Sequence, residues 1–323
     1  MIDQFGRKID YMRVSVTDRC NLRCRYCMPE VAACETHDAI LRYEEILRVC
    51  RTAAELGITK FKVTGGEPLV RRGCVDFIAR LKVLPGVEQV TLTTNGLLLG
   101  EELDALREAG LDAVNVSLDT LDDEKYSRIT GYPGAAAGEL RALLGRCCEK
   151  GLRTKVNAVL LEENLDEVIS LAGIAAELPV DVRFIELMPI GFGDSLTRVS
   201  PDGVLARLQA AWPDLHATDE KRGNGPARYF ASDALQGRIG MIDAVSHRFC
   251  DSCNRVRLTS TGQLKPCLCF DSTLDLRAML RAGASDEEIR EALRLAVERK
   301  PRQHSFEARG EITERRTMSQ IGG

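Results

Sequence analysis

The sequence of 323 residues predicts an α/β fold built around a parallel sheet. Between residues 11 and 187, short apolar runs of β-forming residues alternate with segments of helical periodicity, which is the pattern of repeated β–α units. Several of these runs end in polar or glycine-rich clusters. Six units of this kind predict either a partial barrel or a doubly wound sheet, and the clusters at the strand ends favour a barrel-like site.

Six runs are expected to form the strands of this sheet. In chain order they are MRVSVT (12–17), KFKVTGG (60–66), QVTLTTNG (89–96), AVNVSLD (113–119), TKVNAVLL (154–161) and VDVRFIEL (180–187). A helix is expected at 43–57, because apolar residues from Ile46 to Leu56 recur at helical spacing and Gly57 is a suitable C-terminal cap. Comparable helical patterns separate the later runs.

The character of the sequence changes after Pro189. A polar, glycine-rich connector occupies 219–228, and a hairpin is expected to turn at Gly262. We therefore expect a partial (β/α)6 barrel over residues 1–230 and a smaller C-terminal domain over residues 231–323.

Composition limits the classes of function. A formal net charge of −4 argues against a nucleic-acid-binding protein. No apolar run has the length of a membrane span, and the amino terminus lacks the apolar core of a secretory signal, so we expect a cytoplasmic location. In that compartment the 12 cysteines are expected to bind metal or to remain buried thiols rather than to form disulfides.

The first cysteine group is Cys20, Cys24 and Cys27, with the spacing C-x3-C-x2-C. Buried thiols fit poorly with the polar residues around them, and a structural zinc site needs a fourth ligand that the neighbouring sequence does not supply. Three cysteines on a [4Fe–4S] cluster leave one iron without a protein ligand. That open iron is then available to a substrate or cofactor.

This spacing resembles the hallmark of the radical S-adenosylmethionine (SAM) superfamily. The resemblance implies that SAM binds the open iron and that its reductive cleavage gives a 5′-deoxyadenosyl radical. It also places Tyr26 near the adenine, and it places Gly66 and Glu67 of TGGEP near the amino group of SAM. Glycines allow close approach of the backbone, and a carboxylate pairs with an ammonium group.

The second cysteine group is Cys250, Cys253 and Cys267, with Cys269 close behind. Four cysteines at this spacing are also compatible with a zinc site. The group nevertheless resembles the GTP 3′,8-cyclases of molybdenum cofactor biosynthesis, in which C-x2-C and a third cysteine, after 13 intervening residues, hold a second [4Fe–4S] cluster. Cys269 departs from the family pattern, and we expect it to be a spectator, although the sequence does not settle whether it ligates the cluster.

The resemblance covers nearly the whole chain. It rests on DRCNLRCRYCMP, TGGEPLVR, TTNG, SLD, KVNAV, RFIELMP, CNRVRLT and the terminal IGG. It implies a radical SAM lyase that converts GTP to 3′,8-cyclo-7,8-dihydro-GTP, by removing the C3′ hydrogen and joining C3′ to C8 of guanine. Two [4Fe–4S] clusters and SAM are the implied cofactors.

Substrate and cofactor residues follow from basic side chains near strand ends and from the resemblance. A nucleoside triphosphate needs several cations, and no P-loop is present to cradle it. The residues expected to contact GTP are Arg19, Lys60, Lys62, Thr93, Lys155, Arg183, Arg255, Val256 and Arg257. Those expected to contact SAM are Tyr26, Gly66, Glu67, Ser117 and Met188.

The tail ends in Gly322 and Gly323. Composition alone predicts a disordered end. The resemblance instead implies that the two glycines reach into the active site, where a residue without a side chain fits a crowded cavity.

Other functions and partners stay open at this point. The main alternative is a radical SAM enzyme that modifies a peptide and carries an auxiliary cluster; an iron–sulfur or zinc protein acting as scaffold or electron carrier is another. The resemblance further implies an electron donor, a homodimer, and product transfer to cyclic pyranopterin monophosphate synthase.

Overall fold

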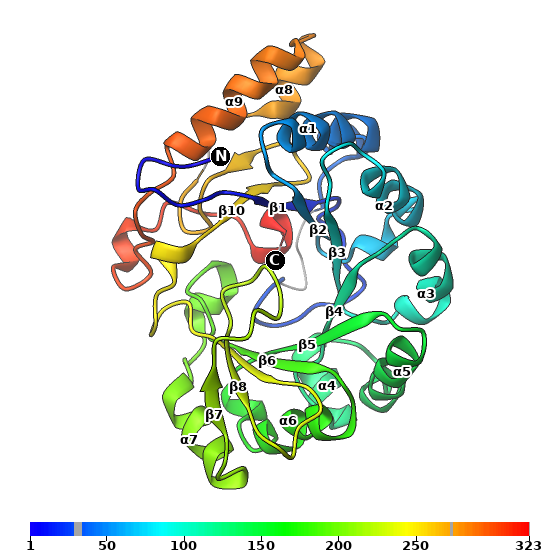
Figure 1. The fold of residues 1–323 in the computed structure, drawn as a ribbon, viewed down its shortest axis with the longest axis vertical. Coiled ribbons are helices and arrows are strands. Elements are labelled where there is room, and N and C mark those ends of the chain that lie inside the picture. Colours follow the sequence, from blue (N-terminus) through cyan, green and yellow to red (C-terminus); the bar gives the residue numbers. More distant parts are fainter. Residues whose placement is uncertain (29–33, 272–273, 323) are drawn as a thin grey trace.

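A single curved sheet organises the computed structural model, which describes residues 1–28, 34–271 and 274–322 (Figure 1). Its strand order is β11-β10-β1-β2-β3-β4-β5-β6-β9-β8-β7. The strands are β1 (Tyr11–Ser15), β2 (Lys60–Thr64), β3 (Gln89–Thr94), β4 (Ala113–Ser117), β5 (Arg153–Val159), β6 (Asp181–Ile185), β7 (His216–Thr218), β8 (Arg228–Ala231), β9 (Ile239–Ile242), β10 (Arg255–Leu258) and β11 (Leu264–Lys265). Strands β1 to β6 are parallel, so the expected partial barrel is confirmed.

Helices α1 to α6 cover the convex face of the sheet (Figure 1). The helices are α1 (Tyr43–Glu55), α2 (Cys74–Lys82), α3 (Leu99–Glu108), α4 (Asp123–Thr130), α5 (Ala137–Glu149), α6 (Val168–Glu177), α7 (Pro201–Ala211), α8 (Leu276–Arg281), α9 (Asp286–Glu298) and α10 (Met318–Ile321). In the described part of the chain, none of them combines the length and apolarity needed to cross a bilayer.

Successive side chains of each strand point alternately toward the helical layer and into the barrel interior. In β2, Phe61 and Val63 are buried in the main apolar core, whereas Lys62 lines the interior. The β1–β2 register pairs Lys62 with Arg13, and the β1–β10 register pairs Arg13 with Arg257. The helices therefore pack on an apolar face, while polar and charged side chains project into the barrel.

The C-terminal third extends both edges of the barrel. Strand β10 adds in parallel to β1 and then forms the expected hairpin with β11, around Gly262. At the other edge β9 adds to β6, followed by antiparallel β8 and β7. The expected division between residues 230 and 231 falls inside β8.

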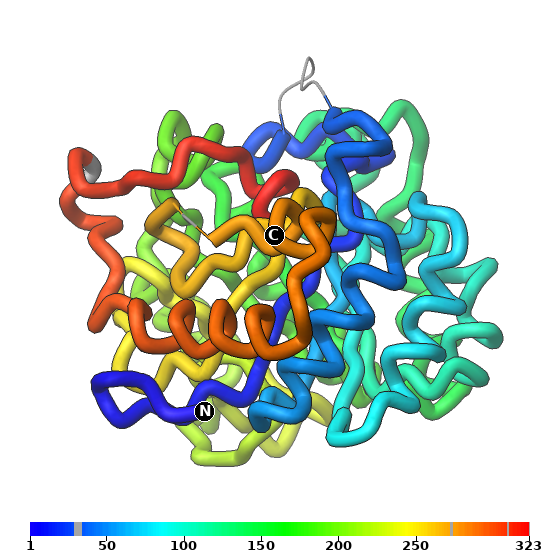
Figure 2. Tube along the Cα trace, turned by 90° about the horizontal axis from the view of Figure 1, so that it is seen from above, coloured from blue at the N-terminus to red at the C-terminus, as the bar shows by residue number. Residues whose placement is uncertain are grey.

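The tail returns to the middle of the molecule, where both views place the C-terminus (Figures 1 and 2). It is held by an ion pair between Lys265 and Glu314, whose side chains are both fully buried. Arg257 Nη1 then donates to the Gly322 carbonyl at 3.1 Å. Gly322 therefore lies buried against Ser15 and Thr64 at the ends of β1 and β2, whereas Gly323 lies outside the described residues. That the two glycines reach into the active site stays a prediction.

A close backbone contact at Gly237 gives a test of this packing. An added Cβ there would lie 1.9 Å from the Val180 carbonyl oxygen, whereas a Cβ at the exposed Gly138 of α5 meets nothing within 4 Å. We expect Gly237→Ala to lower the free energy of unfolding by about 2 kcal/mol or more. Gly138→Ala should leave it unchanged or raise it by up to about 1 kcal/mol. Urea unfolding measures both, and equal midpoints for the two variants would contradict the packing.

Candidate active site

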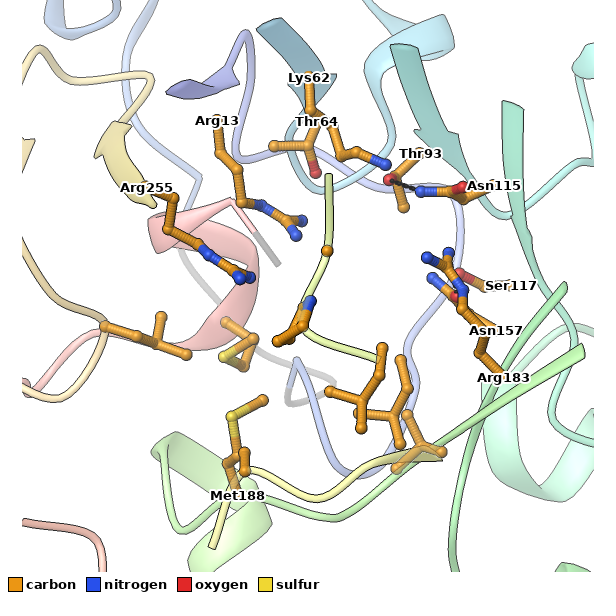
Figure 3. Close-up of a pocket in the computed structure, with 18 of the residues that line it drawn as sticks. Arg13, Lys62, Thr64, Thr93, Asn115, Ser117, Asn157, Arg183, Met188 and Arg255 are labelled. Carbon is orange, nitrogen blue, oxygen red and sulfur yellow. Dashed lines mark hydrogen bonds between the residues drawn. The ribbon is translucent and has the colours of Figure 1, made fainter. Parts of the chain in front are cut away.

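The barrel encloses a cavity of about 350 Å³ that is lined by both cysteine groups. Its walls come from β1 to β6, the connector after β7, and the loop that carries the second group. Figure 3 shows the labelled side chains converging on this space: Arg13 and Arg255 lie on one side, and Arg183 and Asn157 face them. Residues far apart in the sequence thus share one chamber.

The loop that carries Cys20, Cys24 and Cys27 is pressed against the end of β2. The Gly66 N–H donates to the Thr17 carbonyl at 2.8 Å. A Cβ on Gly66 would approach the Arg19 carbonyl oxygen to 2.5 Å. Glycine is therefore required at this position because the loop backbone occupies the space of a side chain.

Glu67 clamps the ends of β2 and β3 from within the protein. Its carboxylate accepts hydrogen bonds from the Asn95 N–H at 2.7 Å and from the Thr94 hydroxyl at 2.9 Å. Burial raises the pKa of Glu67 to about 7. Glu67 is fully buried and does not line the cavity, so the structure does not bring it to the site expected for a SAM ammonium group.

The remaining residues expected to contact SAM surround the first cysteine group. Tyr26, Gly66, Ser117 and Met188 all line the cavity. The Tyr26 hydroxyl donates to Asp119 at 2.7 Å. Burial raises the pKa of Asp119 to about 6.

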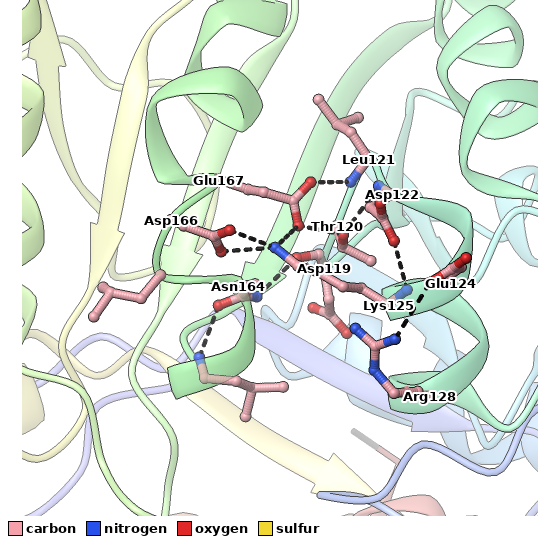
Figure 4. Close-up of polar contacts among 12 residues, drawn as sticks. Asp119, Thr120, Leu121, Asp122, Glu124, Lys125, Arg128, Asn164, Asp166 and Glu167 are labelled. Carbon is pink, nitrogen blue, oxygen red and sulfur yellow. Dashed lines mark hydrogen bonds and ion pairs between the residues drawn. The ribbon is translucent and has the colours of Figure 1, made fainter.

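A polar network between the loops after β4 and β5 fixes the position of Asp119 (Figure 4). The Asn164 amide donates to the Asp119 carbonyl at 2.7 Å, and Lys125 forms ion pairs with Asp166 at 2.7 Å and Glu167 at 3.2 Å. The Glu167 carboxylate also accepts from the Leu121 N–H at 3.1 Å. These contacts hold the loops after β4 and β5 together. They thereby fix the position of Asp119, which accepts from the Tyr26 hydroxyl.

The second cysteine group faces the same cavity through Cys250, Cys253 and Cys267. Burial raises the pKa of Cys253, but Arg255 and Lys300 outweigh it and lower that pKa to about 7. The thiolate that a metal requires is therefore favoured at this position. Cys269 is fully buried in a separate apolar cluster and does not line the cavity, which agrees with its expected spectator role.

Each group offers three thiols at one cavity, and thiols are the donors that iron–sulfur clusters use. Polar groups also approach the sulfurs: the Leu22 N–H lies 3.4 Å from Cys20 Sγ, and the Asn95 amide lies 3.8 Å from it. These residues fit a cluster in both donor type and hydrogen bonding. In the described ranges, no three His, Cys, Asp or Glu side chains converge as ligands of one metal ion.

Between the two groups the cavity wall is strongly cationic. Burial and its charged neighbours Arg183, Arg13, Lys155 and Arg255 lower the pKa of Lys62 well below its usual value. Burial, Arg13 and Arg255 lower the pKa of Arg257 to about 9. Such a concentration of buried positive charge is suited to a polyanion.

Lys155 lies deeper in this wall and is already paired. Its ammonium group lies 2.8 Å from Asp181 and 3.0 Å from the Tyr229 hydroxyl, and it also donates to the Arg222 carbonyl. Arg222 pairs with the same Asp181 at 2.8 Å. Lys155 thus ties the glycine-rich connector to the barrel wall.

The structure brings most, but not all, of the expected substrate residues to the cavity. Lys62, Thr93, Lys155, Arg183, Arg255 and Arg257 line it. Arg19 is exposed and lies outside it, and Lys60 pairs with Asp10 at 2.8 Å instead. Val256 points to the opposite face of β10 and is buried in the apolar core.

Arg13 is the main residue that the sequence reading missed. It interrupts the apolar run of β1 and lines the cavity beside Arg255 (Figure 3). The same signal, a cation within an apolar strand, identified Lys62 and would have identified Arg13. Asn115 and His304, which also line the cavity, carried no comparable signal.

Comparisons with known proteins agree with this architecture. The model of the radical SAM superfamily matches residues 14–173, and that of Molybdenum Cofactor Synthesis C matches residues 180–306. The chain is 42% identical to a GTP 3′,8-cyclase of Clostridium perfringens over 325 residues and 45% identical to one of Heliobacterium modesticaldum over 338 residues. Each alignment covers 100% of both chains.

Among solved structures, Streptococcus suis SuiB bound to S-adenosylmethionine is similar, with a TM-score of 0.62 and 16% identity. The match covers 81% of this chain and 61% of SuiB. At this identity the likeness concerns the fold alone.

The raised pKa of Glu67 predicts a pH dependence of stability. The folded-state pKa of about 7 exceeds the ordinary value of 4.5. The contribution of Glu67 to the free energy of unfolding is therefore largest below pH 4.5 and is lost as the pH rises through 7. Between pH 5 and 8 the free energy of unfolding of the cluster-free wild type should fall, relative to Glu67→Gln, by on the order of 3 kcal/mol. Urea unfolding across this range measures the difference, with the exposed Glu101→Gln as control. Parallel profiles for wild type and Glu67→Gln would contradict it.

Proposed function

The chain belongs to the GTP 3′,8-cyclase family of radical SAM enzymes, and we propose that its two cysteine groups hold two [4Fe–4S] clusters on opposite sides of bound GTP. The observation that carries this proposal is that Cys20, Cys24 and Cys27 share one cavity with Cys250, Cys253 and Cys267. Each group leaves one iron of its cluster without a protein thiolate.

The enzyme is a radical SAM lyase that converts GTP to 3′,8-cyclo-7,8-dihydro-GTP, the first step of molybdenum cofactor biosynthesis. Tyr26, Gly66, Ser117 and Met188 would hold SAM beside the first cysteine group, where it would supply a radical able to abstract hydrogen. The protein holds the C3′ hydrogen of GTP within reach of it and excludes competing reactions.

The cationic wall binds the triphosphate. GTP carries about four negative charges, and Arg13, Lys62, Arg183 and Arg255 present positive charge from four different strands. The Arg183 Nε and Arg255 Nε atoms are buried and have no hydrogen-bond partner among the described residues. Phosphate oxygens are the acceptors that satisfy them.

The tail completes the substrate site. A Cβ on Gly322 would lie 2.6 Å from Ser15 Cβ, and the residue has φ of +86°, so a side chain is excluded on two grounds. Its carbonyl accepts from Arg257 and thereby fixes one cation of the wall. Gly322 thereby shapes the cavity wall through Arg257, and we propose the same role for Gly323 from the family resemblance alone.

A peptide-modifying radical SAM enzyme is not favoured. SuiB has been solved with its precursor peptide SuiA, but it shares only 15% identity with this chain. The full-length relatives at 40–45% identity are GTP 3′,8-cyclases. The cationic wall also fits a triphosphate better than an uncharged peptide.

The remaining assignments complete this proposal. Residues 1–230 hold the first cluster, and residues 231–323 hold the second. An electron donor reduces the clusters, the cytoplasm supplies reducing conditions, and the product passes to cyclic pyranopterin monophosphate synthase. A homodimer is the proposed assembly.

Cluster content and radical formation test the proposal together. Anaerobically reconstituted protein should contain about eight iron atoms per chain and form 5′-deoxyadenosine from SAM and dithionite in a GTP-dependent manner. Cys24→Ala should abolish that product, and Cys267→Ala should lose its GTP dependence and about half of the iron. Cys269→Ala is the matched control and should retain both. If protein with both clusters forms 5′-deoxyadenosine at the same rate with and without GTP, GTP is not the substrate.

Lys62 and Lys60 form a matched pair for the phosphate site, since they lie on the same strand and only Lys62 lines the cavity. Lys62→Ala should raise the KM for GTP roughly 10- to 100-fold, because a charged hydrogen-bond donor to phosphate is lost. Lys60→Ala, which removes an ion pair with Asp10, should change it by no more than about twofold. Steady-state kinetics give the KM for GTP of both variants. An equal change in the two would mean that the phosphates do not bind beside Lys62.

A further inference from the structure

The segment 300–305 runs beside the second cysteine group and supplies hydrogen-bond donors to its sulfurs. The Ser305 N–H donates to Cys269 Sγ at 3.4 Å, and the Lys300 ammonium and the His304 backbone N–H lie beside Cys253 and Cys250. One short stretch thus serves three sulfur atoms. The imidazole of His304 is a further donor in this stretch.

The tautomer of His304 follows from its contacts. Nδ1 accepts a hydrogen bond from the Phe306 N–H at 3.3 Å, so Nδ1 carries no proton and the neutral ring holds its proton on Nε2. The ring also stacks on Phe306, with centroids 4.3 Å apart. Both contacts fix the direction in which the Nε2–H bond points.

The Nε2–H group has no acceptor in the described part of the protein. The Ala244 carbonyl lies beside the ring without meeting hydrogen-bond geometry. His304 is 6% exposed, and a buried donor without a partner costs about 1–3 kcal/mol. The residue lines the cavity together with Cys250, Cys253 and Cys267, so a group bound at those cysteines can supply the missing acceptor.

We infer that His304 donates its Nε2–H to a sulfur atom of the second [4Fe–4S] cluster and so raises the reduction potential of that cluster. The inference rests on the proposed function, because it needs the second cluster. Hydrogen bonds to cluster sulfurs stabilise the more negative, reduced state. His304 thus belongs with Lys300 and Ser305 to one set of donors that surrounds the second group.

Two substitutions separate this role from packing. His304→Asn keeps an acceptor for the Phe306 N–H at the place of Nδ1 but removes the donor at the place of Nε2. His304→Gln restores a donor at the place of Nε2. The exposed His247, which pairs with Asp202, gives the control His247→Asn.

The measurement is a redox titration followed by electron paramagnetic resonance. It uses full-length protein in which Cys20, Cys24 and Cys27 are changed to alanine, so that only the second cluster contributes, and neither SAM nor GTP is added. We expect His304→Asn to shift the midpoint potential to a more negative value, His304→Gln to return it toward the parent, and His247→Asn to leave it unchanged.

An unchanged midpoint in His304→Asn, with about four iron atoms per chain retained, overturns the inference and leaves the second cluster in place. A second titration is made with GTP present, and a difference between His304→Asn and the parent that appears only there also overturns the inference, since the donor then serves the substrate. A parent protein that binds no iron after reconstitution overturns the second cluster and the inference together.

Discussion

Repulsion among buried cations is the constraint on which the interior of this barrel depends. Strand alternation directs Arg13, Lys62, Arg183 and Arg257 inward. The parallel registers set Arg13 beside Lys62 and Arg257, and Arg183 faces Arg13 across the cavity (Figure 3). Burial first, and then these cationic neighbours, lower the pKa of Lys62 well below its usual value, so a positive charge is costly to hold there. The apolar outer face, packed under the helices, must supply the stability that offsets it. A polyanionic ligand reverses the balance, so the charges that burden the empty fold become the source of its affinity for substrate.

Much of this arrangement could be predicted because it is local. The apolar strand runs, the cysteine spacing and the alternation that turns every second side chain inward each depend on residues close together in the sequence. The expected partial barrel followed from these local signals. How far along the barrel axis a side chain lies cannot be predicted from neighbouring residues alone. Lys60 and Lys62 share the same parity, but Lys60 pairs with Asp10 whereas Lys62 lines the cavity. Arg19 illustrates the same limit, since only the three-dimensional path of the cysteine loop turns it to solvent.

Contacts between distant segments were beyond composition and periodicity. The buried Lys265–Glu314 pair holds a tail that reads as disordered from its residues alone. The position of Gly322 was anticipated by family resemblance and not by any property of glycine. Glu67 shows the converse case: its motif was recognised, but its carboxylate is consumed by Thr94 and Asn95 rather than offered to a ligand.

The pairing of β10 with β1 has a consequence for synthesis of the chain on the ribosome. Strand β1 emerges early, yet the strand that covers its outer edge begins at Arg255. At roughly 5–20 residues per second, that edge waits on the order of ten to fifty seconds for its partner. During this interval a nascent barrel presents unpaired backbone groups to other chains. Slow elongation therefore favours aggregation of this protein, and a chaperone that covers a bare sheet edge favours its yield.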